Sequence, residues 1–100
     1  MVTANLPDEA TAKEYLAWLE DGHVDQVIES GAHSAMMVRF DPEPQGAKGP
    51  IRVLVQYIFP TRQVFQRYIE KHSPALRAEG LKKFGPERGV TFERAIGAIV

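Results

Sequence analysis

The chain carries its strongest hydrophobic pattern in residues 51–59, where apolar side chains fill both rows of an expected strand. Successive residues of a strand point to opposite faces of a sheet. One row consists of Ile51, Val53, Val55, Tyr57 and Phe59, and the other contains Leu54 and Ile58. This strand therefore needs apolar cover on both faces, and the sequence leaves open which row meets the helices.

The first half of the chain predicts a strand, two helical pieces and a second strand. Residues 2–6 alternate in polarity and end at Pro7, which is typical of a short strand. Asp8 is suited to cap a helix that ends or is interrupted at Gly22, and residues 23–30 predict a second helical piece. Residues 34–40 alternate again, whereas residues 41–50 hold three prolines and two glycines and predict an exposed hairpin loop.

The second half repeats this order. Pro60 ends the strand of residues 51–59, and Thr61 is suited to cap the next helix. The apolar face of that helix consists of Val64, Phe65, Tyr68, Ile69, His72 and Leu76. Pro74 predicts a kink or an end near residues 71–73, and residues 75–84 resume a helical pattern. Residues 90–100 predict the last strand, in which Gly97 is suited to a bulge.

This order predicts an α+β fold of the ferredoxin-like βαββαβ type in a single domain, residues 1–100. Four antiparallel strands would form one sheet, with the helices on a single face. The other face stays bare, and Met36, Val38 or Phe40 would enlarge an apolar patch there. We therefore expect a homodimer that pairs two sheets through their open faces.

Composition narrows the class of protein. Hydrophobic residues make up 44% and charged residues 25%, and the formal net charge is -1. This balance gives no electrostatic reason to expect nucleic acid or an anionic membrane surface as a partner. The chain has no cysteine, its start lacks the pattern of a signal peptide, and no apolar run approaches a membrane span. We expect a soluble cytoplasmic protein.

Several short motifs carry a resemblance over nearly the entire chain. They are Trp18 and His23, Gly31-Ala32, residues 55–57, residues 68–77 and Phe84-Gly85. Together they resemble a family of small bacterial proteins known only as a domain of unknown function. That family is similar to the dimeric α+β barrel proteins, which include the antibiotic-biosynthesis monooxygenases. The resemblance implies the fold and the dimer but no activity, and the stretch Thr3-Ala4-Asn5 departs from the expected first strand.

The three histidines, His23, His33 and His72, offer the first candidate chemistry. Their spacing matches no metal-binding motif, so we predict no metal site. His23 is expected to cap a helix or to pack beside Trp18. His72 is expected to be half-buried and hydrogen-bonded beside the proline kink, with a catalytic or ligand-binding role as the alternative.

Aromatic and cationic side chains offer a second candidate site. Trp18, Tyr57 and Tyr68, with Gln56, could wall a pocket for a small apolar or aromatic ligand, although core packing would explain the same aromatic residues. Arg77 and Arg94 are expected to pair with Glu79 or Glu93, or with an acid of a ligand. The candidate ligand-binding residues are Trp18, His23, Gln56, Tyr57, Tyr68, His72 and Arg77.

No catalytic residue can be assigned, because phosphate-binding glycine motifs and a serine nucleophile elbow are both missing. We therefore expect a noncatalytic module that binds a small ligand or a protein partner and needs no cofactor. The alternative is a cofactor-independent monooxygenase-like or isomerase-like enzyme that acts on a small aromatic or apolar substrate.

Overall fold

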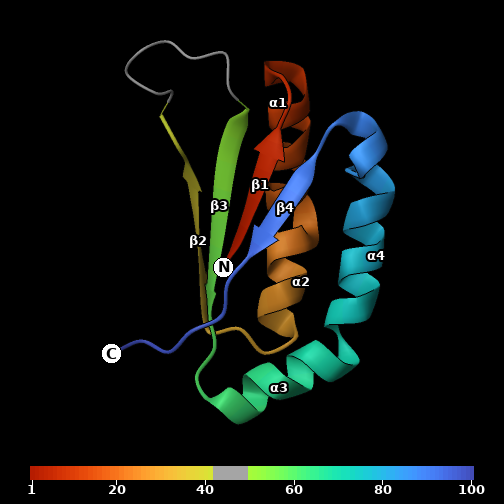
Figure 1. Cartoon of the computed structure of the whole chain (residues 1–100). Helices are drawn as coiled ribbons and strands as arrows, with labels where there is room; N and C mark the ends of the chain where they lie inside the picture. The colour runs from red at the N-terminus through yellow and green to blue at the C-terminus, as the bar shows by residue number, and fades with distance from the viewer. Residues whose placement is uncertain (42–49) are drawn as a thin grey trace.

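The computed structural model describes residues 1–41 and 50–100 and has an α+β fold around one open antiparallel sheet (Figure 1). The strands are β1 (Val2–Leu6), β2 (Ser34–Arg39), β3 (Ile51–Ile58) and β4 (Thr91–Arg94). Their order across the sheet is β2-β3-β1-β4, and every neighbouring pair is antiparallel. The α-helices are α1 (Glu9–Trp18), α2 (Val24–Glu29), α3 (Arg62–Lys71) and α4 (Ser73–Lys83). Most of the predicted loop of residues 41–50 lies outside the described residues.

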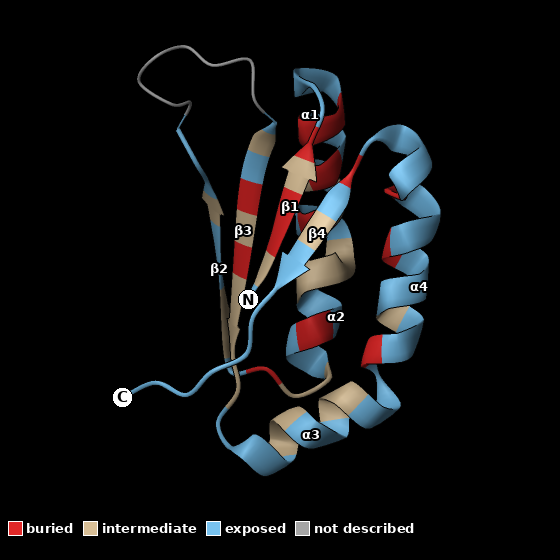
Figure 2. Cartoon of the chain, viewed as in Figure 1, coloured by how far each residue is buried: buried red, intermediate tan, exposed pale blue. Residues whose placement is uncertain are grey.

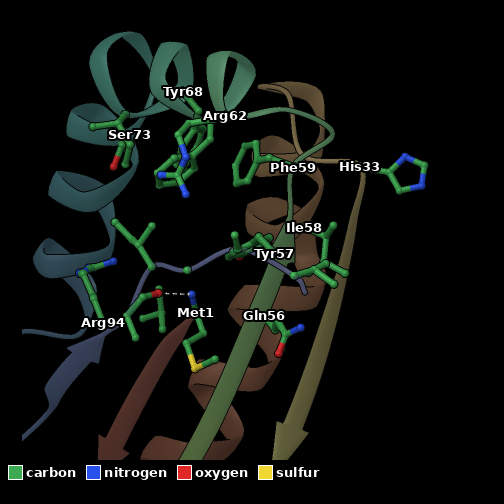
Figure 3. Close-up of a pocket in the computed structure, with 18 of the residues that line it drawn as sticks. Met1, His33, Gln56, Tyr57, Ile58, Phe59, Arg62, Tyr68, Ser73 and Arg94 are labelled. Carbon is green, nitrogen blue, oxygen red and sulfur yellow. Dashed lines mark hydrogen bonds between the residues drawn. The ribbon is translucent and has the colours of Figure 1, made fainter.

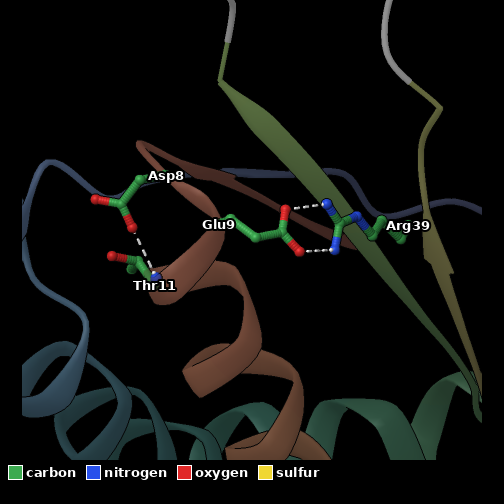
Figure 4. Close-up of polar contacts among 4 residues, drawn as sticks. All are labelled: Asp8, Glu9, Thr11 and Arg39. Atoms are coloured by element: carbon green, nitrogen blue, oxygen red, sulfur yellow. Dashed lines mark hydrogen bonds and ion pairs between the residues drawn. The ribbon is translucent and has the colours of Figure 1, made fainter.

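The link between β1 and α1 follows from local hydrogen bonding. Asp8 has extended backbone angles, and its side chain accepts a hydrogen bond of 2.8 Å from the Thr11 N–H, as predicted for an N-cap. In the next residue, the Glu9 carboxylate accepts two hydrogen bonds from Arg39 on β2 (Figure 4). This pair joins the start of α1 to the edge of the sheet, although its exposure limits its contribution to stability.

The break between α1 and α2 is also confirmed. Asp21 and Gly22 leave helical geometry, and Gly22 has a φ of 116°, a conformation that glycine adopts without a steric penalty. The helical pieces on either side pack on the sheet, α1 against β1 and β3 and α2 against β2. In Figure 1 both helices lie behind the sheet.

The row of β3 that contains Val53 and Val55 faces the helices. Both residues are fully buried, and they pack with Tyr15 and Leu19 of the α1 region and with Phe84 after α4. Figure 2 shows the same arrangement, with buried positions on β1, β3 and α1. The Tyr15 and Phe84 rings meet edge to face at 5.3 Å, a preferred aromatic geometry. The core therefore lies between the sheet and the helices α1 and α4.

The opposite face of the sheet carries the second apolar row. The strand register places Met36 beside Gln56 and Val38 beside Leu54 on this face. Leu54 and Val38 are half-buried, and 53% of Met36 is exposed. Figure 1 draws no helix over this side of the strands among the described residues. The predicted open apolar face is present in the single chain.

Two separate helices meet near Pro74, and the alternative prediction of a single kinked helix is not observed. Thr61 caps α3, since its Oγ1 accepts a hydrogen bond of 3.1 Å from the Val64 N–H. After α3 a new helix begins at Ser73, and Pro74 occupies its first turn, where no N–H partner is required. The expected half-burial of His72 is wrong: the residue is exposed at the corner between the helices, and its ring makes no hydrogen bond among the described residues.

The last strand, predicted over residues 90–100, is shorter in the structure. β4 ends at Arg94, and residues 95–100, called the C-terminal tail below, have no regular structure. The register explains the difference, because Arg94 pairs with Val2 at the end of β1, and only Ala95 continues the ladder through backbone bonds with Met1. The bulge expected at Gly97 is also wrong, since this residue lies beyond the strand.

We predict that Gly31 fixes the position of α3. Gly31 has a φ of 129°, and a Cβ atom there would lie 2.9 Å from Cγ1 of Val64 on α3. Gly31→Ala is expected to lower the free energy of unfolding by about 2 kcal/mol or more, through backbone strain and displacement of Val64. Urea unfolding measures the change.

Two other glycines separate the effect of backbone strain from the effect of the Val64 contact. Gly22 shares a positive φ but has open space around its Cβ position, so Gly22→Ala is expected to cost about 1 kcal/mol. Gly97 has open space without a positive φ, so Gly97→Ala leaves stability unchanged. A Gly31→Ala protein no less stable than the Gly22→Ala protein would contradict a role for the Val64 contact.

Candidate functional site

A cavity of about 920 Å³ lies at the end of the sheet where β3 leads into α3 (Figure 3). Aromatic side chains from the two elements form much of its wall, namely Tyr57, Phe59, Phe65 and Tyr68. The Phe59 ring packs against Phe65 and Tyr68, with 5.1 Å between ring centroids in each pair. The C-terminal tail forms another wall through Ala95, Ile96 and the residues that follow. The cavity is thus bounded by segments from both halves of the chain.

The charged side chains that line this cavity are cationic. Arg62, Arg77 and Arg94 line it, together with Met1, whose terminal amine donates a hydrogen bond of 2.7 Å to the Ala95 carbonyl. No aspartate or glutamate is found among the described residues that line it. The cavity therefore combines apolar walls with an excess of positive charge.

A smaller chamber of about 60 Å³ lies between the helices and the sheet. It shares Tyr57, Tyr68, Arg77 and Arg94 with the larger cavity, and Trp18 and His23 are among its remaining walls. Its volume suits one or two water molecules rather than a ligand. Because the two spaces share these wall residues, they lie next to each other. A movement of a shared side chain in one space is expected to alter the shape of the other.

His23 is the most unusual polar group of the smaller chamber. Its ring stacks on Trp18 with 4.0 Å between centroids, which confirms the expected packing of the two residues. Its Nδ1 atom is buried and has no hydrogen-bond partner among the described residues. Burial lowers the pKa of His23, an effect that nearby Glu79 opposes and Arg94 reinforces. The imidazole is therefore neutral at pH 7.

The tyrosines stay protonated over a wide pH range. Burial, followed by the proximity of Tyr15 and Tyr68, raises the pKa of Tyr57. Burial also raises the pKa of Tyr68, against the opposing effect of Ser73 and the neighbouring arginines. Both hydroxyl groups can therefore donate hydrogen bonds to a ligand at neutral pH.

The expected salt bridges of Arg77 and Arg94 are wrong. Among the described residues the ion pairs join Arg39 to Glu9, Arg52 to Glu93 and Arg88 to Glu14. Glu93 lies on the opposite face of β4 from Arg94, where it is 3.9 Å from Arg52. Burial lowers the pKa of Arg94, and the positive charge of Arg77 lowers it further. The two arginines thus line the same spaces with like charge.

The structure brings together most of the predicted site residues. Gln56, Tyr57, Tyr68 and Arg77 line the larger cavity, and the smaller chamber adds Trp18 and His23. His72 lines neither space. His33 borders the larger cavity, but its ring points away from the other labelled side chains in Figure 3.

Other wall residues were missed as ligand-binding candidates. Phe59 and Phe65 were counted as core positions of a strand and a helix. Arg62 was not among the predicted ligand-binding residues, and the C-terminal tail was predicted to be a strand. Arg94, which was expected to pair with an acid, follows Phe92 by two residues, so both side chains lie on the same face of β4.

The described residues show neither a group of metal-binding side chains nor a helix suited to span a membrane. Residues 1–41 and 50–100 contain no cluster of three or more histidine, cysteine or acidic side chains able to hold a metal ion. Within the same ranges, no helix has the length and apolar character required to cross a bilayer.

We predict that His23 makes stability depend on pH near neutrality. Its pKa is lower in the folded chain than in the unfolded chain, so the unfolded chain takes up a proton first as the pH falls. Stability contributed by neutral His23 is present above about pH 6.5 and is lost as the pH falls through the folded pKa. Urea unfolding at a series of pH values measures this loss.

Phenylalanine can keep the stack on Trp18 without a titrating group, so His23→Phe is expected to flatten the pH dependence. His72→Phe alters an exposed histidine and serves as the control, with the native dependence retained. Equal loss of stability in the native and His23→Phe proteins on acidification would rule out this role of His23.

Comparison with known proteins adds a family but no activity. No curated protein and no solved structure matches the chain. A family model described as "Domain of unknown function (DUF4286)" matches residues 1–99. The match covers both cavities and every element that forms them. The chain therefore belongs to the DUF4286 family of domains of unknown function.

Proposed function

We propose that this protein is a noncatalytic, homodimeric module that binds a small apolar or aromatic ligand in the larger cavity. The observation that carries this function is the cavity itself, whose volume of about 920 Å³ is suited to a small organic molecule. Its walls are mainly aromatic and aliphatic, with a few polar groups at defined positions. Such a wall binds an apolar body by removing it from water and leaves the polar groups to select among ligands.

In the proposed assembly each chain has a ferredoxin-like fold, and two chains pair as in the dimeric α+β barrel proteins. The strand order β2-β3-β1-β4 supports this kinship, because it is the order expected when two βαβ halves interlock in one antiparallel sheet. The placement of α1 and α2 on one side of the sheet is consistent with it.

A second copy of the chain is the proposed cover of the open sheet face. Met36, Val38 and Leu54 make part of this face apolar. Arg52 and Glu93 also lie on it, and they neutralise one another within one chain. Two copies related by a twofold axis could therefore bring apolar surfaces together without strong charge repulsion.

An enzyme remains the second candidate because of one specific group. The buried Nδ1 atom of His23 has no partner among the described residues, and the neutral ring lines the smaller chamber. A neutral imidazole could accept a proton, through a water molecule in this chamber, from a substrate in the larger cavity. Turnover of a bound compound that is lost in His23→Phe would favour this alternative over a noncatalytic module.

Ligand binding can be tested with the neutral fluorescent probe 1-aminoanthracene. The apolar cavity is expected to bind the probe, and Ile69→Arg, which puts a charged group into the wall on α3, should weaken binding about tenfold or more. Probe fluorescence during titration gives the affinity. Energy transfer from Trp18, the single tryptophan, reports that the probe is bound to the protein.

The matched control for this test is Ile28→Arg. It makes the same exchange on α2 at an exposed position that lines neither space. Binding to this control should equal binding to the native protein. Equal binding to the Ile69→Arg protein as well, or no binding to the native protein, would argue against the cavity as a ligand site.

The dimer has a separate test on adjacent methionines of β2. Met36 lies on the open face, whereas Met37 pairs with Val55 and lies on the helix side. Sedimentation should give a mass of two chains for the native protein and for Met37→Glu. Met36→Glu should shift the equilibrium to one chain, because like charges would meet in an apolar interface. A native mass of one chain at micromolar concentration would refute the dimer.

A further inference from the structure

The charges that surround the larger cavity have one sign. Arg62, Arg77 and Arg94 contribute positive charge, and none of the described wall residues is acidic. The chain as a whole has a formal net charge of -1. The positive character of the cavity is therefore a local property, and it favours an anionic group on the ligand.

Arg77 and Arg94 are the best placed of these cations. They come from α4 and β4, and both line the larger cavity and the smaller chamber. The ion pairs within residues 1–41 and 50–100 involve Arg39, Arg52 and Arg88 instead. Two guanidinium groups that line one cavity without a carboxylate partner repel one another, and solvent screens part of this repulsion because both residues are exposed. An anion bound between them would remove this cost.

The neighbouring hydroxyl groups extend the same site. Tyr57 and Tyr68 border both spaces beside the arginines, and each carries an O–H that can donate to an oxygen of the ligand. A guanidinium group offers a planar pair of N–H donors that matches the two oxygens of a carboxylate. On the basis of the ligand-binding function proposed above, we propose that the cavity selects apolar molecules that carry one carboxylate, anchored by Arg77 and Arg94.

The rest of the wall restricts the class of anion. Phe59, Phe65 and Ile69 give the cavity a large apolar surface that an inorganic ion would leave without a contact. A nucleotide would place several phosphate charges against these same rings, at a high desolvation cost. An aromatic or aliphatic monocarboxylic acid matches both parts of the site.

The test compares two compounds that differ mainly in charge, 2-naphthoate and 2-naphthamide. Isothermal titration should show that the native protein binds the naphthoate at least tenfold more tightly, because charge-assisted hydrogen bonds are stronger than neutral ones. Arg77→Met and Arg94→Met should each weaken naphthoate binding about tenfold and leave naphthamide binding unchanged. Arg67→Met, at an exposed position of α3 outside both spaces, should behave as the native protein.

The outcomes separate this inference from the proposed function. Equal affinity for the two compounds, with 1-aminoanthracene still bound, would overturn the carboxylate preference and leave the ligand-binding function intact. No binding of any of the three compounds would overturn both. Inorganic phosphate that competes with naphthoate at similar concentrations would also overturn the proposed class, since it would show a simple anion site.

A stability measurement tests whether Arg94 has a purely structural role. Without ligand, Arg94→Met removes one of two neighbouring like charges, so its melting temperature should equal or exceed that of the native protein. A clearly lower melting temperature would mean that Arg94 supports the fold, and would overturn its assignment as an anchor.

Discussion

Strand β3 constrains the rest of the structure, because it is paired along both edges and is apolar on both faces. Backbone hydrogen bonding to β1 and β2 fixes it inside the sheet, so neither row of side chains can turn away from its face. Val53 and Val55 pack against the helices and form the centre of the core. The opposite row, with Leu54, is left at a surface that the described part of the chain does not cover with a helix.

The same strand determines where the ligand cavity forms. β3 runs to Ile58, and α3 begins at Arg62 after a short turn at Pro60. The side chains of Phe59 and Tyr68 meet at this turn, beyond the region where α1 packs on the sheet. The helices thus cover the middle of the sheet closely and leave space at its end, which the C-terminal tail only partly encloses.

Much of the fold could be predicted because it is encoded locally. The caps at Asp8 and Thr61, the break at Gly22 and the turn at Pro60 depend on side chains and backbone angles within a few residues. The length of β4 could not be predicted, because it depends on how far β1 extends beside it. The exposure of His72 was missed because Pro74 predicted a kink or an end near residues 71–73 but not the direction that α4 takes from there.

The candidate site was predictable in Tyr57, Tyr68 and Arg77, but not in its other aromatic residues or in its balance of charge. The sequence placed Tyr57 and Tyr68 in one candidate pocket, but it left open whether the row of Tyr57 or the row of Gln56 faces the helices. The partners of Arg77 and Arg94 depend on which face of β4 each side chain occupies and on the approach of α4. Glu93 is adjacent to Arg94 in sequence but lies across the sheet from it, and this separation gives the cavity its unbalanced charge.

The open face also owes part of its apolar character to a chemically reactive group. Met36 on the edge strand β2 is 53% exposed and presents a thioether to solvent. Oxidation to the sulfoxide converts such a side chain from apolar to polar, and cellular reductases can reverse the change. An oxidant could therefore alter how this face meets other molecules while the core between the sheet and the helices stays intact.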